Sequence, residues 1–185
     1  MKFILLLSFL LGCCAYSGVD VSSLVSTDSW QCMASSGYTF AVIRGYRSSG
    51  SVDPNTLSTI DNAWKGGMKY VDVYLFPCPT CSKSATDQVD ELVNYLSGSQ
   101  YGMIWLDIEG TQYWTSNTSS NVDFITGLVD QVYMMDFSSR FYSVYHPLNW
   151  SLNILSTRNN SIILTVWPTQ TLGKSKRGYP RLLYK

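Results

Sequence analysis

Apolar residues along this chain repeat with two different periods. Some segments carry them three or four positions apart, the spacing of one helix face, whereas others are short runs rich in β-branched and aromatic residues, as in strands. The segments with helical spacing are 53–67, 84–98 and 121–135. The strand-like runs are 18–23, 38–47, 68–76, 101–110 and 140–146, with 161–167 as a further candidate.

Helix-end residues support this division of the chain. Pro54 lies near the start of the first helical segment, and Gly66 with Gly67 stand where that helix should end. The stretch around Trp30 and Met33, between the first two strands, is interpreted as a short connecting segment.

Strands and helices therefore alternate, which predicts βα units and a parallel sheet. An open doubly wound sheet and a closed barrel both satisfy this order. In either architecture, functional side chains gather at the carboxyl ends of the strands, where the loops begin.

One strand-like run, "YGMIWLDIEG" at 101–110, places two acids among apolar residues. If the strand continues through them, Asp107 and Glu109 point to the same side. Two carboxylates in a poorly hydrated site raise the pKa of at least one of them, which is how proteins prepare an acid catalyst. The alternative is a strand that ends at Leu106, with both acids in a solvated loop.

Composition limits the classes of partner. At 185 residues, one domain is expected over 18–185. Hydrophobic residues make up 45% of the chain and charged residues 14%, with a formal net charge of zero. The chain should therefore fold, and it has no overall attraction for nucleic acid or for an anionic membrane.

The two ends of the chain differ from the rest. Residues 1–17, with an early Lys, an apolar stretch and then small residues, are typical of a secretory signal peptide, which predicts a secreted, soluble protein. From Ser138 onward there is no Asp or Glu. We interpret 170–185 as a loose, solvated basic tail, with a nucleic-acid patch as the alternative; its last dozen residues show no period that predicts a strand or helix.

Beyond the signal segment, three cysteines remain: Cys32, Cys78 and Cys81. Secretion favours a structural disulfide, of Cys78 with Cys81 or of either with Cys32. A redox dithiol is the alternative for the C-x-x-C pair. A zinc site needs two more ligands, and the chain has one histidine, His146, so no metal or other cofactor is predicted.

Three motifs in order, "GVDVSS", "VDVYLFPCPTC" and "IWLDIEG", resemble the family-25 glycoside hydrolases, secreted lysozymes of the muramidase type, in their nematode and protist branch. The resemblance runs from Gly18 to about Tyr145. It implies an α/β fold, a parallel β/α barrel that is incomplete at its C-terminal end.

By position, the resemblance implies that Glu109 is the proton donor and that Asp107 and Asp20 complete an acidic cluster. Asp72 and Tyr74 fall where the family lines its substrate groove. Four aromatic side chains near these acids are suited to stack on sugar rings, although each one alone could equally be ordinary packing. They are Tyr46, Tyr74, Tyr113 and Trp114.

The resemblance also implies a reaction. A monomeric enzyme would cleave peptidoglycan between N-acetylmuramic acid and N-acetylglucosamine, for defence or digestion. Such cleavage needs a proton for the leaving oxygen and negative charge beside a cation-like sugar carbon, which two carboxylates can supply. The alternative is a secreted, inactive glycan-binding relative, since no acid follows Asp136 to supply the family's C-terminal acidic residue.

Overall fold

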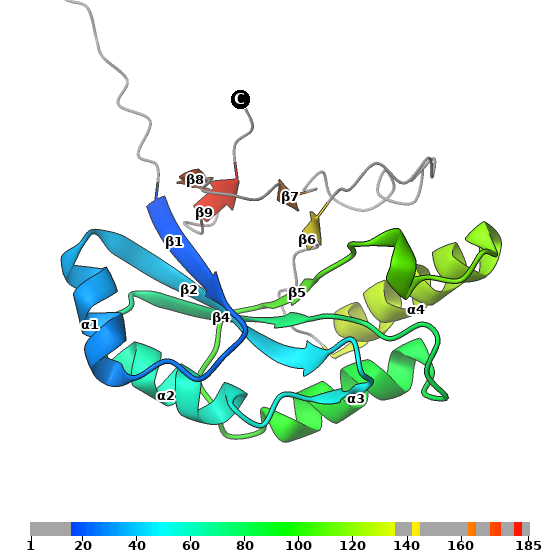
Figure 1. The fold of residues 1–185 in the computed structure, drawn as a ribbon, viewed down its shortest axis with the longest axis horizontal. Coiled ribbons are helices and arrows are strands. Elements are labelled where there is room, and N and C mark those ends of the chain that lie inside the picture. Colours follow the sequence, from blue (N-terminus) through cyan, green and yellow to red (C-terminus); the bar gives the residue numbers. More distant parts are fainter. Residues whose placement is uncertain (1–15, 136–141, 145–162, 166–170, 175–179, 183–185) are drawn as a thin grey trace, which may run out of the picture.

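The computed structural model describes residues 16–135, 142–144, 163–165, 171–174 and 180–182 (Figure 1). Four parallel strands form the centre of its main sheet, in the order β5-β4-β2-β1. They are β1 (Tyr16–Val21), β2 (Tyr38–Arg47), β4 (Tyr70–Leu75) and β5 (Ile104–Leu106). The strand-like runs of the sequence are thus confirmed in the central sheet.

The helices lie together on one side of this sheet (Figure 1). They are α1 (Thr27–Ser35), α2 (Thr56–Lys65), α3 (Ala85–Tyr95) and α4 (Thr118–Met134), with a short 3-10 helix, η1 (Thr111–Tyr113). Ser84 and Asp87 form a reciprocal capping box at the start of α3. Gly67 follows α2 at φ 91°, a conformation that favours glycine after a helix.

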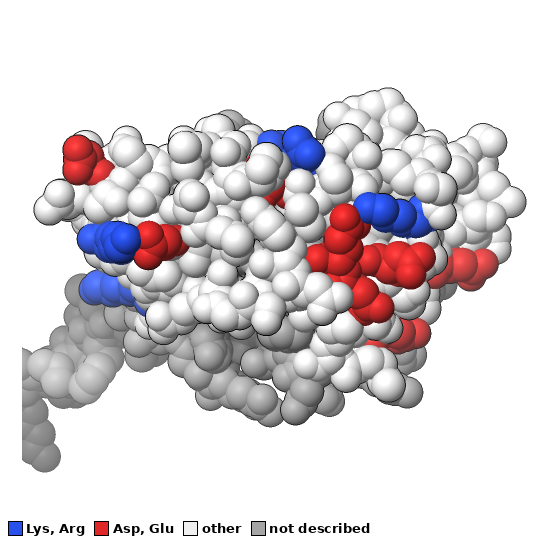
Figure 2. Space-filling model, turned by 90° about the horizontal axis from the view of Figure 1, so that it is seen from below, with Lys and Arg blue, Asp and Glu red and all other residues white. Residues whose placement is uncertain are grey.

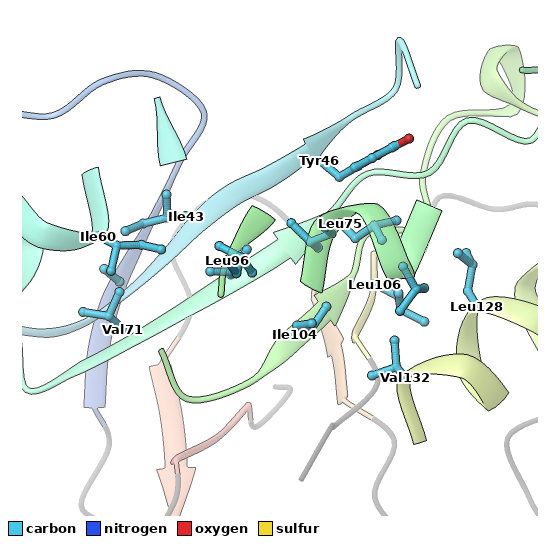
Figure 3. Packing of buried hydrophobic residues seen from close by; sticks show 14 of the residues in the cluster. Ile43, Tyr46, Ile60, Val71, Leu75, Leu96, Ile104, Leu106, Leu128 and Val132 are labelled. Carbon is cyan, nitrogen blue, oxygen red and sulfur yellow. The ribbon is translucent and has the colours of Figure 1, made fainter. Parts of the chain in front are cut away.

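Alternating side chains divide the sheet into two faces. Ile43, Val71 and Ile104 point toward the helices and form the core with residues such as Leu96 and Leu128 (Figure 3). On the opposite face, here called the inner face, Met103 and Trp105 pack with Val42 and Tyr74. The helix face supplies the apolar burial, so the inner face is the one on which polar chemistry can be placed.

Several elements differ from the prediction. The connecting segment around Trp30 is the helix α1, and Ser51–Val52 form a short strand, β3, that pairs with the end of β2. Within the segment 170–185, β8 (Thr171–Lys174) pairs antiparallel with β1, and β9 (Pro180–Leu182) pairs with β8. Backbone pairing with the edge of the sheet defines these strands. Such pairing requires no regular spacing of apolar residues, so the sequence pattern did not predict them.

The fold class is an α/β barrel-like sheet that the described strands do not close. β6 (Tyr142–Val144) and β7 (Ile163–Thr165) pair with each other in a separate parallel sheet. Among the described strands, no pairing joins this sheet to β5. The predicted incomplete barrel is therefore confirmed for this part of the chain. The signal segment and His146 lie outside the described residues, except that Tyr16 and Ser17 belong to β1.

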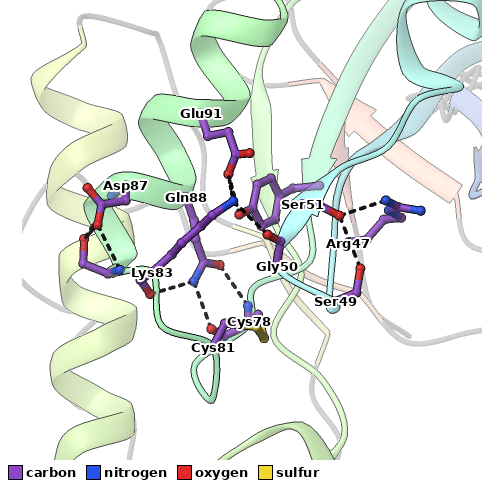
Figure 4. Close-up of polar contacts among 12 residues, drawn as sticks. Arg47, Ser49, Gly50, Ser51, Cys78, Cys81, Lys83, Asp87, Gln88 and Glu91 are labelled. Atoms are coloured by element: carbon purple, nitrogen blue, oxygen red, sulfur yellow. Dashed lines mark hydrogen bonds and ion pairs between the residues drawn. A yellow bond between two sulfur atoms is a disulfide. The ribbon is translucent and has the colours of Figure 1, made fainter.

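A disulfide joins Cys78 and Cys81 in the loop after β4, which leaves Cys32 exposed and free. The fully buried side chain of Gln88, on α3, holds this loop by accepting a bond from the Cys78 N–H and donating to the Cys78 carbonyl, each at 2.9 Å (Figure 4). Its amide also donates to the carbonyl of Lys83 at 3.2 Å. The disulfide loop is therefore fixed to α3, which argues against a cycling redox pair.

Gln88→Leu is expected to lower the free energy of unfolding by roughly 2–4 kcal/mol, because it leaves buried backbone groups of the loop without partners. Chemical denaturation followed by circular dichroism measures the change. Gln31→Leu, at an exposed position on α1, is the matched control and should change stability little. Equal effects of the two substitutions would contradict the assigned role of Gln88.

Candidate active site

Three acids, Asp20, Asp107 and Glu109, reach the inner face at the first and last strands of the central sheet. Asp20, on β1, is in register with Val42 of β2, which in turn is in register with Asp72 of β4. Asp107 directly follows β5, and its N–H bonds the Leu75 carbonyl at 2.9 Å, extending the ladder by one step. Parallel pairing puts the carboxyl ends of these strands at the same edge of the sheet, and the acidic side chains therefore lie at that edge.

The strand β5 ends at Leu106, as the alternative interpretation of the run 101–110 supposed. Asp107 and Glu109 nevertheless do not lie in a solvated loop. Asp107 and Glu109 are both half-buried. Ile108 between them is 5% exposed and packs in the core on the helix face. The alternation of the strand therefore persists past its end, with both acids directed away from Ile108.

Electrostatic coupling shows that the three carboxyl groups form one cluster. Burial, together with the charges of Glu109 and Asp20, raises the pKa of Asp107 to about 8. Asp20 keeps solvent contact, yet partial desolvation raises its pKa to about 6, with the charge of Glu109 as the second cause. At pH 7 Asp20 is therefore mostly ionised, whereas Asp107 holds a proton.

None of the three carboxyl groups in this cluster forms a hydrogen bond or an ion pair within the described part of the chain. The Oδ1 atom of Asp107 is buried and has no partner there at all. Buried polar atoms without partners are rare and often mark a site for a ligand. We call Asp20, Asp107 and Glu109 the acid cluster.

Acids elsewhere on the molecule behave differently. Asp and Glu side chains gather on the helix-covered side, over α3 and α4 (Figure 2). There Glu91 accepts from Lys83 and from the Tyr46 hydroxyl, and Asp90 accepts from Gln131 at 2.6 Å. These half-buried carboxylates are engaged in structural contacts, whereas Asp107 and Glu109 are also half-buried but have no such partner within the described residues.

Tyr74 lies on the inner face within reach of the cluster. Burial raises the pKa of its hydroxyl, the charges of Asp20 and Asp107 raise it further, and the nearby Arg44 opposes them. The predicted placement of Tyr74 beside the acids is therefore supported. Arg44, which is in register with Tyr74, was not among the predicted residues; its guanidinium pairs with Asp53 and donates to the Ser22 carbonyl.

The segment after Glu109 fixes the position of that acid. The indole N–H of Trp114 donates to the Glu109 carbonyl at 3.0 Å, and Trp114 is 7% exposed. Gly110, between them, has φ 61°, and a Cβ there would come within 3 Å of Gln112 and Tyr113. Trp114 is therefore a support for the backbone of Glu109 and is too buried to stack on a sugar ring, in contrast to its predicted role.

Tyr113 remains available at the surface, with 36% of its area exposed. Its ring meets Phe76 edge to face, with centroids 4.8 Å apart. Phe76 follows Tyr74 by two positions, so the alternation of β4 could have identified it as a second aromatic residue on the inner face.

Two predicted substrate-binding residues have structural roles instead. Tyr46 has no exposed area and faces α3, where its hydroxyl donates to Glu91 at 2.9 Å, so it cannot stack on a sugar. Asp72 is 8% exposed and accepts bonds from the Met103 N–H and the Trp105 indole, at 3.1 and 2.9 Å. Asp72 therefore positions Trp105, which lies two residues before Asp107 on the same face.

The described residues contain no group of three or more His, Cys, Asp or Glu side chains arranged to hold a metal ion. Within the same residues, no helix combines the length and the apolar character that crossing a membrane requires.

A parallel α/β sheet with a cluster of unpaired, coupled carboxyl groups at its strand ends defines a class, the barrel-type proteins of the glycoside hydrolase kind. A family model described as "Lysozyme-like protein 1" matches residues 13–180. The chain belongs to this family of lysozyme-like proteins, among the family-25 glycoside hydrolases. The match extends past Tyr145, where the resemblance recognised from the sequence ends.

Individual relatives agree with this placement. "Probable GH family 25 lysozyme 2" of Dictyostelium discoideum is 54% identical over 117 residues, which are 62% of this chain and 54% of the relative. "Lysozyme-like protein 5" of Caenorhabditis elegans is 34% identical over 159 residues, 83% of this chain and 72% of the relative. The chain spans about half the length of the Dictyostelium lysozymes that it matches.

Solved structures show the same fold at low identity. A family 25 glycosyl hydrolase from Bacillus anthracis superposes with a TM-score of 0.63 at 14% identity, covering 92% of this chain and 89% of that one. A muramidase from Trichobolus zukalii gives a TM-score of 0.56 at 21% identity, covering 71% and 66%. What this chain shares with these structures is the arrangement of strands and helices.

Proposed function

We propose that the protein is a glycosidase that cleaves peptidoglycan between N-acetylmuramic acid and N-acetylglucosamine. The single observation that carries this proposal is the acid cluster, whose carboxyl groups interact with one another but have no structural partner among the described residues. Structural acids are normally hydrogen-bonded or paired, so unpaired ones at strand ends are suited to act on a ligand. The named specificities of the muramidase and lysozyme relatives point to the same substrate class.

In this proposal the three carboxyl groups divide the chemistry. Asp20, with a pKa of about 6, is largely ionised at neutral pH and supplies negative charge beside the cation-like sugar carbon. Asp107, with a pKa of about 8, keeps its proton at neutral pH. A neutral Asp107 can donate a hydrogen bond to the substrate.

Glu109 is the proposed proton donor to the leaving oxygen. Its backbone is fixed by the Trp114 indole, which gives the side chain a defined origin. Asp107 holds a proton near neutral pH, and its charge state is coupled to the neighbouring carboxylates. The productive arrangement has that proton on Glu109 as the glycosidic oxygen approaches.

This division predicts a bell-shaped pH dependence of kcat/KM, with limbs near pH 6 and pH 8. Below about pH 6 Asp20 is protonated, and above about pH 8 the cluster loses the proton that the leaving group needs. Initial rates on solubilised cell-wall glycan across pH 4–10 measure the profile. A rate that stays level from pH 5 to pH 9 would contradict a cluster with one working proton.

Clearing of bacterial cell-wall suspensions by the purified chain, with a metal chelator present, tests the function itself. Lysis accompanied by new reducing ends on the glycan supports cleavage of a glycosidic bond. A folded protein that binds cell walls without releasing reducing ends would instead be the glycan-binding relative. Peptide release without reducing ends would contradict both functions.

Secretion, and a role in defence or digestion, belong to the same proposal. The Cys78–Cys81 disulfide supports an oxidising compartment, since such bonds persist mainly in secreted proteins. The protein would then meet bacterial walls outside the cell or within a compartment of the secretory pathway.

A further inference from the structure

Arg47, the last residue of β2, lies at the carboxyl edge of the sheet, and none of the described acids is its counter-ion. Its one hydrogen bond within the described residues runs from Nη2 to the Ser51 hydroxyl at 2.8 Å. Its Nε is buried and has no hydrogen-bond partner in the described part of the chain. Arginine side chains that are half-buried are usually paired, because an unpaired charge in such a place is costly.

The neighbouring acid already has other partners, so it does not neutralise the charge of Arg47. Glu91, the acid on the adjoining part of α3, pairs with Lys83 and with Tyr46. Figure 4 shows the Arg47 side chain extending away from Glu91 and from the disulfide loop. The other arginine of β2, Arg44, is paired with Asp53, whereas Arg47 has no acidic partner among the described residues.

A bulge in β2 directs Arg47 to the inner face. Regular alternation from Arg44 would put Tyr46 on the inner face and Arg47 among the helices, but the register shifts between Arg44 and Tyr46. Tyr46 consequently contacts Glu91 of α3, and Arg47, the next residue, points the opposite way. Arg47 is thus on the same face as the acid cluster.

Arg47 is also level with the cluster along the strands. Tyr46 pairs with Leu75, whose carbonyl accepts from the Asp107 N–H, so Arg47, Phe76 and Asp107 occupy one row across β2, β4 and β5. Two interstrand spacings place Arg47 roughly 10 Å from Asp107. A ligand bound at the acid cluster and extending past the bond to be cleaved would reach the guanidinium.

We propose that Arg47 binds a carboxylate of the glycan substrate, carried by the sugar itself or by the peptide attached to it. The Nη1 and Nη2 groups present a planar pair of donors that fits a carboxylate in bidentate fashion. Packing around Nε holds the guanidinium in place before the ligand arrives. This inference rests on the proposed function and specifies which sugar chains the site prefers.

Binding measured by calorimetry to the full chain carrying Glu109→Gln tests the inference without turnover. One ligand pair is the disaccharide of N-acetylglucosamine and N-acetylmuramic acid with its methyl ester. The other pair is the same disaccharide bearing a peptide, with its carboxyls free or amidated. The pair that shows a preference for the free acid identifies the source of the carboxylate.

With Arg47 present, the free acid of one pair should bind about ten-fold or more tightly than its neutral form. Arg47→Gln should remove this preference, Arg47→Lys should retain part of it, and Lys65→Gln, an exposed charge on α2, should leave it intact. If Arg47→Gln does not fold, two other measurements test the proposal. Added salt should abolish the preference for the free acid in the protein that keeps Arg47, and Arg47→Lys should reduce it. A preference that is unchanged in both would overturn the role of Arg47.

The two proposals fail in different ways. Cell-wall lysis by the wild type with no preference in either ligand pair, or with a preference that survives Arg47→Gln, would overturn the role of Arg47 alone. A preference that depends on Arg47 in a protein that lyses no cell wall would overturn the glycosidase function and leave Arg47 as the anion contact of a binding protein.

Discussion

Glu109→Gln is expected to reduce the rate of glycan cleavage about a hundred- to ten-thousand-fold, the usual contribution of general acid catalysis. The amide keeps the shape of the side chain but cannot deliver a proton to the leaving oxygen. Binding of the glycan should change little. Reducing-end release from soluble peptidoglycan measures the rate, and calorimetry measures the binding.

A second substrate separates loss of the proton from loss of structure. An aryl glycoside whose leaving group needs no protonation should lose much less rate in Glu109→Gln than peptidoglycan does. Asp123→Asn, an exposed acid on α4, is the control and should behave as wild type on both substrates. Equal losses on both substrates, or a Glu109→Gln variant as active as wild type, would remove Glu109 from the role of proton donor.

Local signals predicted the helices that have strong ends. Ser84 with Asp87, and the glycines after α2, are short-range features that act within a few residues, so they are visible in the sequence. The helix α1 was missed because Trp30 is its one buried residue, which leaves no apolar stripe to detect. Its Ser26 N-cap, and Gly37 after its C-terminal end at φ 93°, were the available signals.

The acids of the site were predictable, whereas the orientation of its aromatic residues was not. Asp20, Asp107 and Glu109 occupy strand ends, and parallel pairing brings strand ends together in any βα sheet. Tyr46 was misplaced because the bulge at Gly45 of β2 shifts the alternation by one position, and the glycine inside the strand was the signal that could have indicated it. Trp114 was misplaced because its partner, the Glu109 carbonyl, becomes its neighbour only through the turn at Gly110.

The acid cluster also carries a cost in stability. The unfolded chain hydrates each carboxylate freely, whereas the fold partly buries Asp107 beside two other acids. Nothing within the described residues offsets that burial with a hydrogen bond to Oδ1. A site prepared for a ligand in this way should become more stable when its acids are made neutral.

Asp107→Asn is therefore expected to stabilise the fold, by an amount that grows with pH. In the unfolded chain Asp107 loses its proton near the ordinary value of 3.8, but in the fold it keeps the proton up to a pKa of about 8. Between these values the unfolded state binds fewer protons, so wild-type stability falls as pH rises. The variant lacks this loss and should gain roughly 1–3 kcal/mol by pH 8, a figure reduced for partial exposure.

Urea denaturation at pH 4, 6 and 8 measures the difference between wild type and variant. It should be small at pH 4, which is just above the unfolded-state pKa of 3.8, and should level off above pH 8, where both states have lost the proton. Asp61→Asn, which removes an exposed carboxylate of α2 paired with Lys65, is the matched control and should show no such growth. A gain for Asp107→Asn that does not increase between pH 4 and pH 8 would mean that Asp107 is already ionised in the folded protein, and the proton of the cluster would then have to reside elsewhere.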